Sequence, residues 1–206
     1  TLDHMVAHAA AVVRARPRAL VVADMPFLTF HISPEETVRN AGRLVQEGGV
    51  DAVKLEGGTL RVPHVQALLA AGIPVMGHVG LTPQSVLPFG GHRVQGRGDD
   101  AAERILADAA ALEAAGCFSI VLEGMPASLA GKVTRALRIP TIGIGAGAAC
   151  DGQILVVHDL IGLFAATLKF VRRYADLRSV MIDAVSRFRA DVVSGAFPSD
   201  AETYEE

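Results

Sequence analysis

Five ionisable side chains stand where apolar runs of the chain end, and their types could together bind a cation and move a proton. Asp24 closes LVVAD, Lys54 and Glu56 close AVKLE, His78 closes IPVMGH and Glu123 closes SIVLE. Oxygen ligands suit Mg²⁺ better than zinc, which prefers cysteine and histidine. A further carboxylate beside a cation-bound carbonyl could remove the proton from the adjacent carbon. These residues therefore predict metal-assisted enolisation of a small oxo acid.

Each of these residues also has an ordinary structural explanation. Asp24 could cap a helix or a turn, and Lys54 with Glu56 could form a structural ion pair. His78 could hydrogen-bond a loop, and Glu123 could brace the turn that follows it. Burying such groups unpaired is costly, so their gathering at one place needs a reason. Coincidence explains any one of them readily and all five together poorly.

The elements that must position these residues alternate between apolar runs and amphipathic segments. Apolar runs predict strands at 19–24, 51–56, 73–78, 117–123 and 140–144, with a short sixth run at 154–158. Helical periodicity predicts helices at 2–13, from 33 onward, and at 62–71, 99–115, 127–137 and 176–194. The second of these opens with Ser33-Pro34-Glu35-Glu36, a capping-box sequence with proline at the first helical position.

Continuous apolar strands separated by helices indicate a parallel sheet that is covered on both faces. The carboxyl ends of parallel strands lie at one edge, where such folds place their active sites. Lys54 and Glu56 are two residues apart and therefore point to the same face of their strand. Six strands fit an open doubly wound sheet, whereas a closed (β/α)8 barrel needs about eight strands and ~250 residues. Periodicity alone leaves both architectures open.

Composition excludes several classes of protein. The chain has 206 residues, of which 50% are hydrophobic and 20% charged, and its net charge is −3. Such a chain is not disordered, and without a basic stripe it is not expected to bind nucleic acid. Two cysteines cannot build a disulfide framework and suit a reducing cytoplasm. Prolines and glycines interrupt the longest uncharged stretch, 62–92, so we expect no transmembrane helix there. We also expect no signal peptide at the start of the sequence.

Two glycine-rich segments are less specific. The segment at 143–148 has the spacing of a dinucleotide-binding loop, but Cys150-Asp151-Gly152 follows it with turn chemistry where a helix should open. We interpret this segment either as a loop whose backbone N–H groups donate hydrogen bonds at the site or as a tight turn. The segment at 89–98 could be a lid over the site or an ordinary long surface connection.

Several longer strings point to one family. They are VVADMPF at 21–27, VKLEGG at 53–58, GHVGLTPQS at 77–85, VLEGMP at 121–126, IGIGAG at 142–147 and DGQILV at 151–156. In this order, and on to FPSDAETY at 197–204, the chain resembles the ketopantoate hydroxymethyltransferases. The resemblance implies an α/β fold of the (β/α)8 TIM-barrel type. It also implies one domain over 1–206 that lacks the first strands of the barrel, in a cytoplasmic homo-oligomer such as a decamer.

The resemblance further implies a reaction and a role for each residue. Enzymes of this family move a hydroxymethyl group from 5,10-methylenetetrahydrofolate to 3-methyl-2-oxobutanoate, forming 2-dehydropantoate for pantothenate biosynthesis with the help of Mg²⁺. By this resemblance Asp24 binds both the metal and the substrate, Lys54 binds the substrate, and Glu56 binds the metal. Glu123 is the proton acceptor, and His78 is a further catalytic residue within a family signature.

The chain departs from the family pattern at its start. The family has about two further β/α units before the point that corresponds to Thr1, and these include an Asp-Ser pair that supplies another metal ligand and a substrate contact. Two other functions therefore stay open, a related Mg²⁺-dependent oxo-acid lyase or aldolase and an inactive scaffold subunit. Folate dependence would favour the transferase, turnover of pyruvate or glyoxylate the lyase, and metal binding without turnover the scaffold.

Overall fold

The computed structural model describes residues 1–88, 90–91, 93–166 and 168–205 and divides the chain into two compact units, of which the first is Thr1–Ile154. This first unit contains one parallel sheet whose strands are neighbours in chain order. The strands are β1 (Val22–Asp24), β2 (Ala52–Lys54), β3 (Val75–Gly80), β4 (Ser119–Glu123), β5 (Thr141–Ile144) and β6 (Gly152–Gln153). The helices are α1 (Leu2–Arg14), α2 (Pro34–Gln46), α3 (Val62–Ala70), α4 (Asp99–Ala115) and α5 (Ala127–Ala136).

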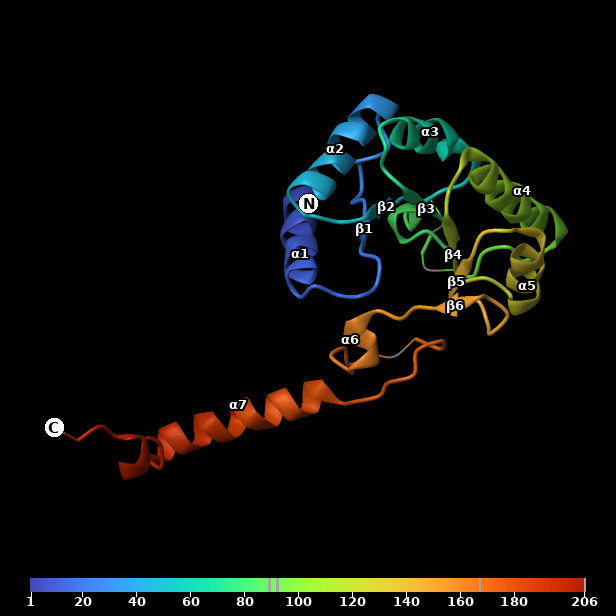
Figure 1. Cartoon of the computed structure of the whole chain (residues 1–206). Coiled ribbons are helices and arrows are strands. Elements are labelled where there is room, and N and C mark those ends of the chain that lie inside the picture. The colour runs from blue at the N-terminus through green and yellow to red at the C-terminus, as the bar shows by residue number, and fades with distance from the viewer. Residues whose placement is uncertain (89, 92, 167, 206) are drawn as a thin grey trace. The chain divides into compact units, whose positions relative to one another are not determined.

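The strand order confirms the barrel type of α/β fold. Figure 1 shows α1 to α5 in an arc around the curled sheet. An open doubly wound sheet reverses its strand order at a switch point, whereas here each new strand adds to the previous one in the same direction. The sheet therefore brings the carboxyl ends of consecutive strands to a common rim.

The hydrophobic core lies between the sheet and these helices. Each of α2, α3 and α4 contributes a fully buried leucine, which packs in one cluster with buried valine and isoleucine side chains of the strands. Burying one such leucine stabilises the fold by about 2 kcal/mol. The three leucines are Leu44, Leu68 and Leu112. This core packs against the strands below the rim that carries the ionisable residues.

The start of α2 follows its sequence signature. Ser33 has an extended backbone, and its hydroxyl accepts a hydrogen bond from the Glu36 N–H at 3.2 Å, while Pro34 is the first helical residue. The hydroxyl thereby satisfies one of the N–H groups that a helix leaves unpaired at its start.

We expect Ser33→Ala to lower the free energy of unfolding by about 1 kcal/mol, because the cap is lost and nothing replaces it. Urea denaturation followed by circular dichroism measures this change. Ser33→Asp is the control, since aspartate also accepts the N–H bond and should keep most of the stability. Equal losses in both variants would show that the hydroxyl does not act as a cap.

The prediction of a strand at 154–158 is wrong. The sixth strand is β6, which ends directly before this run and pairs with Ile142 and Gly143 of β5. Residues Val157–Leu160 instead form the short helix α6. Ile154, Val156 and Val157 are each about half exposed, so this apolar run does not enter the core. The other predicted strands exist but are shorter than expected, except β3, which begins later and extends to Gly80.

The second unit begins at Leu155 and contains α6 and α7 (Leu177–Ser194). Arg173 donates hydrogen bonds to the carbonyls of three successive residues, 164–166. Asp176 caps the start of α7, and Gly195 ends it in the left-handed conformation, so its bounds agree with the helix predicted at 176–194. The prediction of a single domain over 1–206 stays a prediction. Within the described ranges, no helix is long and apolar enough to cross a membrane.

Candidate active site

Four of the five predicted side chains lie on neighbouring strands, Glu56 lies two residues beyond β2, and contacts join all five at the rim. Asp24, Lys54 and Glu123 are the last residues of β1, β2 and β4, and Asp24 pairs with Lys54 in the ladder. His78 lies within β3, two residues beyond Met76, the partner of Lys54. The Gly57 N–H donates to the His78 carbonyl at 3.0 Å, which puts Glu56 and His78 at the same height. Because strand side chains alternate, this register directs all of these residues to one side of the sheet.

Lys54 is the cation at the centre of the cluster. Its Nζ donates to Asp24 Oδ2 at 2.7 Å and lies 3.9 Å from Glu56 Oε1. The Lys54 side chain is 13% exposed, whereas that of Asp24 is 44% exposed. The ammonium therefore offsets the negative charges of both Asp24 and Glu56, and the partly exposed Asp24 carboxylate is accessible to a ligand.

Glu56 is a buried carboxylate whose negative charge is only partly stabilised by its neighbours. Its Oε2 accepts the Gln84 N–H at 2.9 Å, and its Oε1 lies 4.0 Å from His78 Nδ1. Burial raises the pKa of Glu56 from its ordinary value of 4.5 to about 7, although Lys54 and the Gln84 N–H act in the opposite direction. A carboxylate that is costly to ionise in this way is stabilised when a cation binds to it.

His78 separates two carboxylates. Its side chain is almost fully buried, and its Nε2 lies 3.3 Å from Glu123 Oε2. Burial, assisted by the nearby Lys54 charge, lowers the pKa of His78 from 6.5 to about 3. The ring is therefore neutral at physiological pH and lies between Glu56 and Glu123 without adding charge.

The residues present fit a hard cation. Asp24 Oδ1 is buried and has no hydrogen-bond partner in the described part of the chain, while Asp24 Oδ2 is bonded to Lys54. No group of three or more His, Cys, Asp or Glu side chains suited to a metal occurs among the described residues. The cluster itself contains two carboxylates that contact Lys54, Asp24 and Glu56. Mg²⁺ is commonly held by one or two carboxylates, with substrate oxygens and water completing its shell.

Sequence reasoning missed Gln84. Its backbone N–H holds Glu56, and its side-chain amide donates to the Met25 carbonyl at 2.8 Å, which ties the turn η2 (Pro83–Ser85) to the residue after β1. The available signal was Pro83 directly before it. Proline opens a helical turn well, and the N–H groups that follow it are free to bind an acceptor.

The raised pKa of Glu56 predicts a pH-dependent stability difference. In metal-free buffer between about pH 4.5 and 7, the folded chain keeps a proton on Glu56 that the unfolded chain releases. This group therefore costs stability as the pH rises through that window, by roughly 3 kcal/mol in total. Glutamine cannot ionise, so Glu56→Gln does not pay this cost. We therefore expect its free energy of unfolding, relative to that of the wild type, to rise from pH 4.5 to 7 and then level off.

Urea denaturation at several pH values, with EDTA present, measures this difference. Subtracting the free energy of unfolding of the wild type from that of Glu56→Gln cancels the opposite contribution of His78. That contribution stabilises the fold as the pH rises from about 3 to 6.5. If Glu56 binds Mg²⁺, as the family resemblance implies, saturating Mg²⁺ should reverse the advantage near pH 7, because only the wild type then has an ionised carboxylate for the cation to stabilise. A difference that does not change with pH would contradict the raised pKa.

Comparisons with known proteins agree along nearly the whole chain. A family described as "Ketopantoate hydroxymethyltransferase" matches residues 1–200. A 3-methyl-2-oxobutanoate hydroxymethyltransferase of Pelobacter propionicus is 55% identical over 99% of this chain and 76% of its own length. Proteins of the same name from Moorella thermoacetica and a Methylobacterium species are 56% and 58% identical, over 99% and 96% of this chain and 76% and 69% of their own lengths.

Solved structures are similar at the level of the fold. A crystal structure of a provisionally assigned lyase/mutase from Burkholderia cenocepacia has a TM-score of 0.52 and 19% identity, over 96% of this chain and 69% of its own. A provisionally assigned phosphonomutase from the same organism also has a TM-score of 0.52, with 17% identity over 94% of this chain and 78% of its own. At such identities the likeness concerns the fold and not the reaction.

Proposed function

Because this chain belongs to the ketopantoate hydroxymethyltransferase family, we propose that it transfers a one-carbon unit from 5,10-methylenetetrahydrofolate to C3 of 3-methyl-2-oxobutanoate. The product is 2-dehydropantoate, which serves pantothenate biosynthesis. The observation that carries this proposal is the unbroken series of contacts from Asp24 through Lys54, Glu56 and His78 to Glu123. It combines a cation for an acidic substrate, two carboxylates for a metal and a further carboxylate for proton transfer.

The oxo acid would bind through charge. The Lys54 ammonium would hold the substrate carboxylate, and Asp24, the most exposed member of the ion pairs in the cluster, would contact the substrate as well. Asp24 and Glu56 would hold Mg²⁺, which when bound stabilises the negative charge that develops on the keto oxygen. Losing the ion pair with Asp24 would cost Lys54 little, since a substrate carboxylate replaces the aspartate.

Glu123 would move the proton. Its carboxylate takes the proton from C3, and the electron pair of that C–H bond forms the enolate double bond. One C–N bond of the donor's methylene bridge first opens, giving an iminium on the other nitrogen. C3 of the enolate attacks the iminium carbon, so the new carbon–carbon bond forms as the C=N electron pair returns to nitrogen. Water then displaces this second nitrogen and loses a proton to it, which leaves the hydroxyl group on the transferred carbon and releases tetrahydrofolate. His78, 3.3 Å from Glu123, would act as the further catalytic residue by orienting this carboxylate from its buried, neutral ring.

Family membership favours the transferase over the two alternatives. The lyase/mutase and phosphonomutase structures share the fold at 17–19% identity, which carries no argument about the reaction. An inactive scaffold would not need the five side chains to remain in contact. A decameric assembly and a cytoplasmic location are proposed from the family resemblance alone.

Deuterium uptake at C3 of 3-methyl-2-oxobutanoate tests the enolisation. With the purified full chain in D₂O and no folate, we expect the C3 proton signal to disappear from the NMR spectrum only when Mg²⁺ is present. Adding 5,10-methylenetetrahydrofolate should then yield 2-dehydropantoate. No exchange by a folded chain that binds Mg²⁺ and the oxo acid would overturn the enolisation, and exchange without transfer would overturn the choice of donor.

A further inference from the structure

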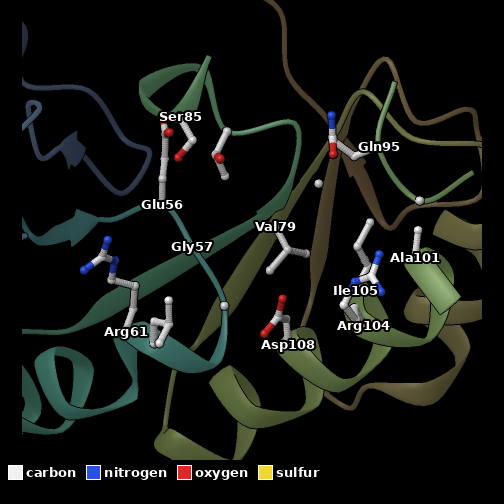
Figure 2. A pocket seen from close by; sticks show the side chains of 15 residues that line it. Glu56, Gly57, Arg61, Val79, Ser85, Gln95, Ala101, Arg104, Ile105 and Asp108 are labelled. Carbon is white, nitrogen blue, oxygen red and sulfur yellow. The ribbon is translucent and has the colours of Figure 1, made fainter. Parts of the chain in front are cut away.

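A cavity of about 300 Å³ lies beside the five-residue cluster, and apart from Glu56 the residues that line it have no part in the mechanism described above. It is bounded by the turn η1 (Thr59–Arg61), the end of β3, the turn η2 and the first turns of α4. Glu56 belongs to both the cluster and the lining of this cavity. Figure 2 shows Asp108 and Arg104 reaching from α4 and Gln95 approaching from the opposite side.

Asp108 is held in a fixed position within this cavity. Its Oδ1 accepts hydrogen bonds from both the N–H and the hydroxyl of Thr59, each at 2.7 Å. A Cβ atom on Gly58 would lie only 1.9 Å from the Asp108 carboxyl carbon, so the absence of a side chain there makes room for the carboxylate. Asp108 Oδ2 has no hydrogen bond to the described part of the chain and is therefore available to a ligand.

The rest of the lining suits a flat, partly apolar ligand with an acidic tail. Val79 and Ile105 are buried and form apolar walls, while Leu60 at the cavity is 83% exposed and would be covered by a bound ring. Arg104 is exposed on α4, one turn before Asp108, and forms no ion pair within the described ranges. The guanidinium of Arg104 is thus free to meet a carboxylate at the rim.

We propose that this cavity binds the pterin end of the folate donor, with Asp108 Oδ2 accepting from the 2-amino and N3–H edge of the pterin. A pterin is a flat ring system with apolar faces and this donor edge, and a carboxylate is its complement. Arg104 then pairs with a carboxylate of the donor's glutamate tail. The inference rests on the proposed function, because it assigns a place to the donor named there. It places the donor directly beside Glu56, next to the substrate site.

Asp108→Asn tests the assignment, with Asp100→Asn as the matched control on the exposed face of the same helix. Asparagine has the shape of aspartate but lacks the charge that attracts the two N–H groups. We expect the KM for 5,10-methylenetetrahydrofolate to rise at least tenfold in Asp108→Asn and to stay within twofold in Asp100→Asn. Deuterium exchange at C3, measured without donor, should stay within twofold in both. Leu60→Ala, which changes an exposed side chain, should raise the same KM severalfold even if Asp108→Asn proves unstable.

Two fragments of the donor separate its head from its tail. 6-Methyltetrahydropterin represents the head and p-aminobenzoylglutamate the tail, and each is measured as an inhibitor competing with the donor. Asp108→Asn should weaken inhibition by the pterin alone, and Arg104→Gln inhibition by the tail alone; the reverse pattern would overturn the assignment.

Two other outcomes would distinguish this assignment from the proposed function. Normal donor use by both Asp108→Asn and Leu60→Ala would overturn the assignment and leave the proposed function standing. A wild-type chain that exchanges deuterium but neither binds tetrahydrofolate nor uses its methylene derivative would overturn both.

Discussion

Glu123→Gln is expected to slow deuterium exchange at C3 of 3-methyl-2-oxobutanoate by about 10³-fold, within the range that a positioned general base contributes. Glutamine has the size of glutamate, so packing against His78, 3.3 Å away, is kept. It cannot take up the C3 proton at neutral pH. Mg²⁺ affinity should stay nearly unchanged, because Asp24 and Glu56, the proposed ligands, are intact. NMR in D₂O measures the exchange, and calorimetry measures Mg²⁺ binding.

Glu103→Gln is the matched control for this variant, because it makes the same chemical change at an exposed position on α4. Its exchange rate should equal that of the wild type. Exchange by Glu123→Gln at more than a tenth of the wild-type rate would show that another group removes the proton. Loss of exchange together with loss of Mg²⁺ binding would instead indicate that Glu123 belongs to the metal site.

Lys54→Met should raise the KM for 3-methyl-2-oxobutanoate by about 100-fold, because it removes the cation that is proposed to hold the substrate carboxylate. Methionine preserves the apolar stem of the lysine, whose side chain is 13% exposed. It leaves Asp24 without its partner, but Asp24 is 44% exposed and can be solvated by water. The KM for the folate donor should change by less than twofold, since the proposed donor cavity does not include Lys54.

Steady-state kinetics with each substrate varied in turn separates these effects. Lys132→Met, at an exposed position of α5, controls for the loss of one positive charge and should leave both KM values unchanged. An unchanged KM for the oxo acid in a folded Lys54→Met variant would show that Lys54 only neutralises Asp24 and Glu56. In that case the ion pair would be structural and the substrate carboxylate would bind elsewhere.

Local signals in the sequence predict the helices well. The bounds of α4 agree with the prediction of 99–115, because Gly116 adopts the left-handed conformation that ends a helix. Gly195 does the same for α7. Cap residues act within one turn of chain, so they can be read without knowing the fold. The placement of ionisable residues at strand ends is equally local, and the parallel sheet then brings them together.

Strand limits depend on distant partners and were predicted less well. The strand predicted at 51–56 includes Asp51, but the Oδ2 atom of Asp51 accepts the Val21 N–H at 2.8 Å, and β2 begins only at Ala52. The apolar run at 154–158 had the composition of a strand, whereas pairing with β5 takes Gly152 and Gln153. Which residues join a ladder is decided by the neighbouring strand, and this information is absent from a short window of sequence.

No signal in the sequence predicts the proposed donor cavity. Asp108 occupies a position in α4 that reads as an ordinary solvated helix residue. Its carboxylate is fixed by Thr59, 49 residues earlier in the chain, and by the missing side chain of Gly58. The roles of these residues follow from packing between η1 and α4, which only the folded chain reveals.

Glu56 lies between the five-residue cluster and the proposed donor cavity, and this position has a thermodynamic consequence. Its carboxylate accepts a hydrogen bond from Gln84, whose side-chain amide in turn holds the turn η2 to Met25. If metal and oxo acid bound at the cluster change the affinity of the cavity for the donor, linkage requires the donor to change their affinity by the same factor.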